Sequence, residues 1–196
     1  MQQIKKIAAI KAVPEQTLVF CDSDSAFFRR FRRDDLLVRG KIGLLDVGYV
    51  NDDVRRWTST SRHLLGLPNS DGEYRNYVGY LVCWNRDTIK ALQQRLERAA
   101  NMQWQLALAR RSSLSEYTLY GVFVREFLGY DATDHTPSDV PLIKSLVGLD
   151  LAKGNQIDDL FSNFDPKTIG IMVHSKGGLE PHQFRGKLEQ LWSALK

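Results

Sequence analysis

The chain has only two cysteines, Cys21 and Cys83, among its 196 residues. Two thiols are too few for a disulfide framework or for a four-ligand zinc site. Each lies in an apolar run, TLVFC or GYLVCW, so we expect both to be buried free thiols in a reducing cytoplasm. The small secreted proteins that depend on disulfides are therefore excluded.

Long hydrophobic runs are also missing. No apolar stretch reaches the roughly 18–20 residues that span a bilayer, and Lys5, Lys6 and Lys11 interrupt the segment that a signal peptide would need. The 14 glycines and 6 prolines form no low-complexity run, which excludes collagen-like and disordered chains. We expect one cytoplasmic domain over residues 1–196 with no integral membrane segment.

Basic residues are in slight excess, with a net charge of +4. Residues 1–100 carry 17 basic and 12 acidic side chains, whereas residues 101–196 carry 10 and 11, so the excess is N-terminal. Its densest point is the RRFRR run at 29–33. A nucleic-acid binder more often shows a basic stripe along a whole face, so we expect no nucleic-acid partner. The run is either a solvated surface or a local site for a phosphate-bearing ligand.

Apolar periodicity predicts an α/β protein. It predicts helices over residues 2–13, 52–65, 85–99 and 115–127, and a last helix from Pro181 whose buried stripe is Phe184, Leu188, Leu191 and Leu195. Short apolar runs predict strands over 17–21, 77–84 and 168–173. The polar segment 129–141 is expected to be a loop. Alternating helices and buried strands are typical of a mostly parallel or mixed central sheet flanked by helices.

Two carboxylates follow the first predicted strand, in Asp22-Ser23-Asp24. Ligands of open α/β sheets bind outside the carboxyl ends of the strands. Mg²⁺ and Mn²⁺ favour carboxylate oxygens there, usually together with substrate phosphates. The competing interpretation is purely local, because Asp and Ser favour turns for their own hydrogen bonds.

A histidine and a lysine follow the last predicted strand. If that strand neighbours the one ending at Cys21, His174 meets the two aspartates at one sheet edge. Lys176 with Gly177-Gly178 would present a charge and backbone N–H groups to a phosphate. Equally, His174 is an ordinary surface residue and Gly-Gly a loop before the helix.

The start of the helix predicted over residues 115–127 offers a third candidate, Glu116. Ser113 and Glu116 have the spacing of a capping box, in which Glu116 only satisfies the helix start. A carboxylate fixed at a helix start is also oriented as a general base must be.

Several segments together resemble known families. LVFCDSDSAFFRRF resembles the strand and Asp-x-Asp turn of A-type glycosyltransferases. HLLGLP, YVGYLVCWNRDTIKAL and WQLALARRSSLSEYTLYGVFV resemble a bacterial, glycosyltransferase-like family of unknown function, DUF6492. The likeness runs from about Gln2 to Phe127, and the strand ending in His174 still fits it.

This resemblance implies a fold of the nucleotide-diphospho-sugar transferase type and transfer of a sugar from a nucleotide-sugar donor to a glycan or another hydroxyl acceptor. It implies that Asp24 binds Mn²⁺ or Mg²⁺, that Asp22 approaches the ribose or the metal, and that His174 completes the metal shell. Glu116 would serve as the base or hold an acceptor hydroxyl. Arg30 and Lys176 would assist the departing diphosphate, whose charge the metal stabilises.

A-type enzymes place a nucleotide-binding βαβ portion before the Asp-x-Asp strand, whereas one predicted helix precedes it here. The expected fold is therefore incomplete on its N-terminal side, with an uncovered apolar edge that favours self-association. The alternative function is a non-catalytic remnant that acts as a binding or scaffold protein. A phosphatase or nuclease ranks last, because Asp46 and Asp150 are weak candidates for its further carboxylates.

Overall fold

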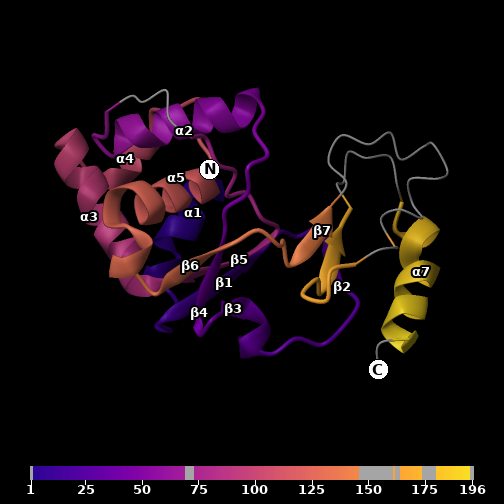
Figure 1. Cartoon of the computed structure of the whole chain (residues 1–196). Helices are drawn as coiled ribbons and strands as arrows, with labels where there is room; N and C mark the ends of the chain where they lie inside the picture. Colours follow the sequence, from indigo (N-terminus) through magenta and orange to yellow (C-terminus); the bar gives the residue numbers. More distant parts are fainter. Residues whose placement is uncertain (1, 69–72, 146–160, 162–163, 174–179, 195–196) are drawn as a thin grey trace. The chain divides into compact units, whose positions relative to one another are not determined.

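The computed structural model describes residues 2–68, 73–145, 161, 164–173 and 180–194. The chain divides into two compact units (Figure 1). The first unit comprises residues 1–20, 37–78 and 83–139, and the second unit comprises residues 21–36, 79–82 and 140–196. The division crosses a two-stranded sheet made of β1 (Thr17–Cys21) and β5 (Leu81–Asn85). The single domain over the whole chain stays a prediction.

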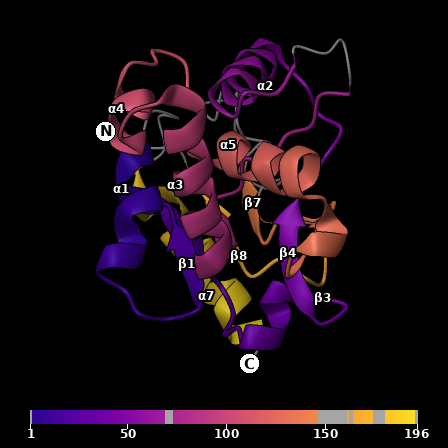
Figure 2. The same ribbon diagram turned by 90° about the vertical axis from the view of Figure 1, so that its left-hand side faces the viewer.

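The first unit contains a group of helices. These are α1 (Gln2–Ala8), α2 (Asp52–Leu64), α3 (Arg86–Ala100), α4 (Trp104–Ala109) and α5 (Glu116–Val122), with the 3₁₀ turns η1 (Ala9–Lys11) and η4 (Tyr130–Ala132). Helix α5 continues directly as the π-helix η3 (Phe123–Leu128). Helix α2 packs against α5, and α3 packs against α4 (Figure 2).

Side-chain caps explain where the two longest helices of this unit begin. The side chain of Asn51 accepts a hydrogen bond from the Val54 N–H at the start of α2, and that of Asn85 accepts from Asp87 and Thr88 at the start of α3. These bonds satisfy N–H groups that have no partner inside the helix. Gly66, at φ 62°, lies just beyond α2. The helices predicted over 52–65 and 85–99 are confirmed.

A three-stranded sheet completes the first unit, in the order β3-β4-β6. Its strands are β3 (Leu37–Val38), β4 (Lys41–Leu45) and β6 (His135–Ser138). Strand β4 runs antiparallel to β3 and parallel to β6, with Ile42 opposite His135. The loop predicted over 129–141 is therefore wrong in its middle part. Pairing with a distant strand decides the conformation of this polar segment, against its local composition.

The second unit is built on the sheet β2-β8-β7, formed by β2 (Ser25–Phe27), β8 (Gly170–Met172) and β7 (Ile143–Ser145). The central strand β8 runs antiparallel to β2 and parallel to β7. A Cβ on Gly170 would lie 2.6 Å from the Ala26 carbonyl oxygen, so only glycine fits where the strands approach. A 3₁₀ turn, η2 (Arg33–Leu36), follows β2.

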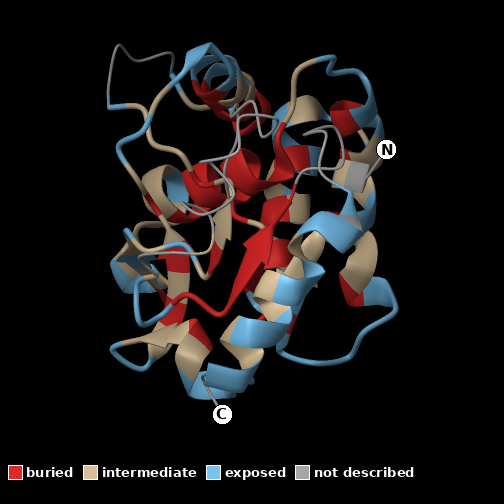
Figure 3. Cartoon of the chain, turned by 90° about the vertical axis from the view of Figure 1, so that its right-hand side faces the viewer, coloured by how far each residue is buried: buried red, intermediate tan, exposed pale blue. Residues whose placement is uncertain are grey.

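Helix α7 (Pro181–Ala194) covers the buried cluster of the second unit. Strand β8 is buried along its length, whereas α7 carries exposed and half-buried residues (Figure 3). Phe184, Leu188 and Leu191 of α7 pack against the buried Phe28 and Ile171. The predicted stripe of the last helix is thus confirmed at these three positions, and Leu195 lies outside the described residues.

The predicted α/β class is confirmed, but the strands of the described residues form three small sheets, and no single central sheet unites them. No helix in the described ranges is long and apolar enough to cross a membrane. Cys83 is buried, and burial raises the pKa of its thiol to about 12. The prediction that Cys21 is buried is wrong, because the residue is exposed at the end of β1.

Two helical glycines differ in the space around them. A Cβ added to Gly121 in α5 would overlap the ring of Tyr77, whereas one added to Gly186 in α7 would meet no atom within 4 Å. The Gly121→Ala substitution should therefore lower the free energy of unfolding by about 2–3 kcal/mol through overpacking. Gly186→Ala should raise it by roughly 0.5–1 kcal/mol through helix propensity. Urea unfolding followed by circular dichroism measures both, and equal effects of the two substitutions would contradict the packing at Gly121.

Candidate functional site

The Asp22-Ser23-Asp24 segment is a tight turn between β1 and β2 in the second unit. The Ser25 N–H donates to the Asp22 carbonyl at 3.1 Å, which closes the turn. The Asp22 N–H donates to the Tyr80 carbonyl at 3.0 Å. After the turn, β2 runs antiparallel to β8.

This turn lies at the carboxyl ends of the parallel strands β7 and β8. Ser145 and Ser25 both lie opposite Met172, the last residue of β8. The next residue, Val173, donates its N–H to the Asp24 carbonyl at 3.2 Å. The last predicted strand therefore does reach the aspartate turn, although it pairs with β2, and β1 pairs with β5. His174 follows Val173 directly and lies, like Lys176, outside the described residues.

Oxygen-bearing side chains surround the turn. Asp22 and Asp24 are half-buried, and the Ser25 hydroxyl is buried without a hydrogen-bond partner in the described part of the chain. Burial raises the pKa of the Tyr80 hydroxyl, hydrogen bonding with Ser145 lowers it, and the charges of Asp22 and Asp24 raise it further. Both carboxylates therefore act electrostatically on the same phenol.

These donors suit a hard divalent cation. Mg²⁺ is usually held by one or two protein carboxylates together with water and substrate phosphates, and the turn supplies two carboxylates next to an unpartnered hydroxyl. Across the described ranges, no three His, Cys, Asp or Glu side chains gather closely enough to hold a metal by themselves. A cation bound at this turn would therefore need further ligands, such as water or a substrate phosphate.

Arg30 lies away from the aspartate turn. Strand β2 carries the chain from the Met172 end of β8 past Gly170, and the Phe28 N–H then donates to the Ile169 carbonyl at 3.2 Å. The neighbouring Arg29 donates from Nε to the Thr168 carbonyl, at the amino end of β8. Strand β2 therefore separates Arg30 from Asp24.

Glu116 is the first residue of α5, in the first unit. The capping-box interpretation is wrong, because the N-cap is Ser115, whose hydroxyl accepts from the Thr118 N–H at 3.3 Å. The Glu116 side chain is 8% exposed, and its carboxylate lies 3.1 Å from Lys6 Nζ. Lys6 also donates to the Tyr117 hydroxyl and lies 4.0 Å from the centre of its ring. Glu116 therefore has a structural partner already.

A comparison with models of protein families identifies the family of this chain. The model of a family of unknown function, DUF6492, matches residues 1–193. The chain belongs to this family. No curated protein matches the chain.

In this DUF6492 member, a second carboxylate cluster forms around Asp46, which follows β4 in the first unit. Asp46 is 5% exposed and accepts hydrogen bonds from Arg75 Nε at 2.5 Å and from the Tyr130 hydroxyl at 2.7 Å. Arg125 Nε lies 3.9 Å away and donates through Nη2 to Glu73. Two arginines thus balance two carboxylates, which indicates an ionic network that joins β4 to η3.

In the sequence, Asp46 is only a weak candidate for a further carboxylate of a metal-dependent site. Its local signal was the same as that of Asp22, an aspartate directly after an apolar run. Its partners Arg75, Arg125 and Tyr130 lie 29, 79 and 84 residues further along, so no spacing could reveal the network. Two further polar atoms, the Tyr77 hydroxyl and Nη1 of Arg125, are buried and have no hydrogen-bond partner in the described part of the chain.

A buried histidine was missed completely. His135 is 1% exposed, and its Nε2 lies 2.9 Å from the Tyr120 hydroxyl, which accepts from the Asn85 N–H at 2.9 Å. The tautomer of the imidazole decides which of the two groups donates in this hydrogen bond. Burial lowers the pKa of His135 to about 4, Asp134 raises it slightly and Lys41 lowers it.

The Lys6–Glu116 pair should contribute to stability. In a double-mutant cycle with Lys6→Met and Glu116→Gln, we expect a coupling of about 1–3 kcal/mol in the free energy of unfolding, because both charges are mostly buried. The exposed Arg185–Glu189 pair, treated the same way, should show a coupling near zero. Urea unfolding measures both cycles. Equal couplings would mean that Glu116 is not held by Lys6.

His135 should make the protein sensitive to acid. Its folded pKa, about 4, is below the unfolded value near 6.5. Only the unfolded chain therefore binds this proton between pH 6.5 and 4. Its stabilising contribution is complete above pH 6.5 and is lost as pH falls, by at most about 1.4 kcal/mol per pH unit. Urea unfolding of the wild type and of His135→Gln at pH 7 and pH 5 tests this, and parallel losses in both proteins would contradict it.

Proposed function

We propose that this chain is a metal-dependent, glycosyltransferase-like enzyme that takes a sugar from a nucleotide-sugar donor to a hydroxyl acceptor. In this proposal, Asp22 and Asp24 hold Mn²⁺ or Mg²⁺. The observation that carries it is the position of the Asp-Ser-Asp turn, at the common carboxyl edge of β7 and β8, with both carboxylates acting on Tyr80.

The position matters because ligands of α/β sheets bind outside the carboxyl ends of parallel strands. Among the described residues, the Asp24 carboxylate forms no ion pair. When bound, the metal would stabilise the negative charge that develops on the departing diphosphate. Membership of a family of unknown function supplies no activity, so the proposal rests on the turn and on the resemblance to A-type enzymes.

The chain's own residues have distinct tasks in this proposal. Asp22 and Asp24 bind the cation, and their charges also act on the half-buried phenol of Tyr80. His174 and Lys176, which follow β8 in sequence, stay predicted members of the site.

Glu116 stays the predicted base or acceptor-binding residue, although its partner Lys6 holds it in place. Proton abstraction by Glu116 would require this ion pair to open or to rearrange. The pair therefore favours one alternative, a non-catalytic protein that binds a nucleotide through the aspartate turn and transfers nothing.

Calorimetric titration tests the metal role. We expect the full chain to bind Mn²⁺, and to bind uridine or guanosine diphosphate more tightly when Mn²⁺ is present. Asp24→Asn should weaken Mn²⁺ binding by about 100-fold or more, because it removes a charged ligand. The matched control Asp34→Asn, an exposed carboxylate of the same unit, should bind as the wild type does.

Two outcomes decide between the alternatives. Unchanged Mn²⁺ binding by a folded Asp24→Asn variant, or no binding by the wild type, would refute the metal site. Binding of Mn²⁺ and nucleotide, without hydrolysis or transfer from any of a panel of nucleotide-sugars, would favour the non-catalytic alternative.

A further inference from the structure

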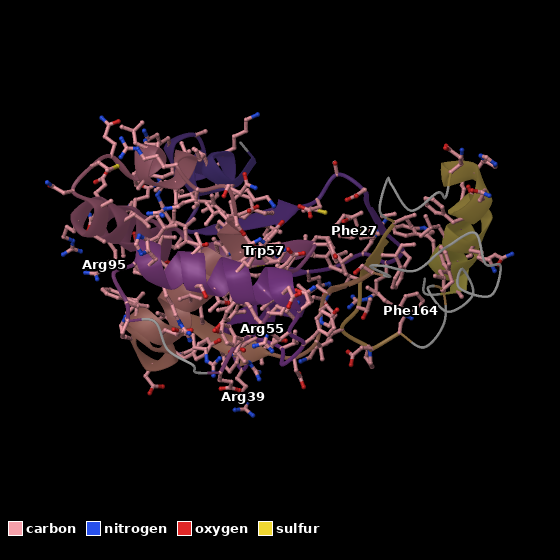
Figure 4. All side chains as sticks on the ribbon, turned by 90° about the horizontal axis from the view of Figure 1, so that it is seen from above. Phe27, Arg39, Arg55, Trp57, Arg95 and Phe164 are labelled. Atoms are coloured by element: carbon pink, nitrogen blue, oxygen red, sulfur yellow. The ribbon has the colours of Figure 1, made fainter. Side chains whose placement is uncertain are left out.

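A basic and aromatic loop lies on the surface of the second unit. We define the Phe27–Arg33 loop as residues 27–33, from the last residue of β2 (labelled in Figure 4) to the first of η2. Phe27 and Phe31 are each 37% exposed, and their rings stack with centroids 5.3 Å apart. Arg30, Arg32 and Arg33 are exposed as well. Two large apolar rings thus lie on the surface among three cations.

The two remaining residues of the loop point inward and fix it. Phe28 is buried, and its ring lies 4.6 Å from that of Phe164. Arg29 donates to the carbonyls of Thr168 and Pro166 and to the carboxylate of Asp35. The loop is therefore preorganised, and little conformational entropy is lost when its outer residues bind.

Nearby carboxylates neutralise only part of the positive charge of the loop. Asp35, the nearest half-buried carboxylate, already pairs with Arg29 and accepts from the Arg32 N–H at 2.6 Å. The Asp35 pKa is lowered chiefly by that backbone bond. In the described part of the chain, no ion pair engages Arg30 or Arg33. One exposed acid, Asp34, follows three exposed cations, so the loop carries net positive charge.

We propose that the Phe27–Arg33 loop binds the surface of an anionic phospholipid membrane. Exposed rings without a polar group favour the boundary between headgroups and acyl chains, while the arginines favour anionic headgroups. This would be peripheral binding, by side chains alone. The proposal does not depend on the glycosyltransferase activity, so either can fail without the other.

Two other occupants fit the loop less well. A second copy of the chain, joined by a two-fold axis, would bring the same three arginines against each other, and like charges repel. A single-stranded nucleic acid needs free ring faces for its bases, whereas Phe27 and Phe31 already stack on each other. The basic residues also form one short cluster and no extended stripe.

Vesicle co-sedimentation of the full chain tests the proposal. We expect binding to phosphatidylcholine vesicles that contain about 30% phosphatidylserine, weak binding to pure phosphatidylcholine, and loss of binding at about 0.5 M salt, because salt screens exposed charges. Each arginine near an anionic surface contributes about fivefold in affinity. The triple variant Arg30→Gln, Arg32→Gln, Arg33→Gln should therefore bind about 100-fold more weakly.

Two further variants separate charge from apolar contact. Phe27→Ser with Phe31→Ser should weaken binding by about tenfold or more at unchanged net charge, because two exposed rings no longer enter the interface. The matched control Arg110→Gln with Arg111→Gln removes two exposed arginines elsewhere and should bind nearly as the wild type does.

Circular dichroism establishes that each variant is folded before it is assayed. Equal binding to charged and neutral vesicles, or equal losses in the loop and control variants, would overturn the proposal. So would binding of a single-stranded oligonucleotide, but not of vesicles, through the same arginines.

Discussion

The hydroxyl of Tyr120 joins three elements of the first unit through hydrogen bonds. It accepts from the Asn85 N–H, at the junction of β5 and α3, and lies 2.9 Å from His135 at the start of β6. The ring of Trp84 stacks on the ring of Tyr120, with the two ring centroids 4.5 Å apart. A buried polar group that loses its partner costs free energy, so these hydrogen bonds stabilise the packing of α5 against the start of α3 and the start of β6. The same burial keeps the imidazole neutral.

In the second unit, the hydrogen bonds at the two ends of β8 fix the segment that carries the candidate site. Arg29 binds the carbonyls that precede β8, while Asp24 accepts from the residue that follows β8. The strand is therefore fixed at both ends by the segment that carries the aspartates. The Asp22-Ser23-Asp24 turn, the proposed metal site, and the Phe27–Arg33 loop lie at opposite ends of β2, so one short strand positions both segments.

Local signals in the sequence predicted part of this arrangement. Capping asparagines and apolar periodicity located α2 and α3, and an apolar run ending in aspartates located the turn. Strand β6 was missed because HTPS is polar, contains proline and becomes a strand only by pairing with distant β4. The neighbour of β8 could not be predicted either, since the direction of the chain after Asp24 depends on a turn. The partners of Asp46 lie too far apart in sequence to form a pattern.

The central place of β8 has a consequence for the order of synthesis. Strand β2 ends at Phe27, but its hydrogen-bonding partner begins at Gly170, so more than a hundred residues separate the two. On a ribosome that adds about 5–20 residues per second, β2 would wait roughly seven to thirty seconds for its partner. The closure of such a long loop is also entropically slow. During this interval Phe28 has no β8 residue to pack on, and a nascent chain therefore exposes the apolar segment around β2 until residues 170–172 have been synthesised.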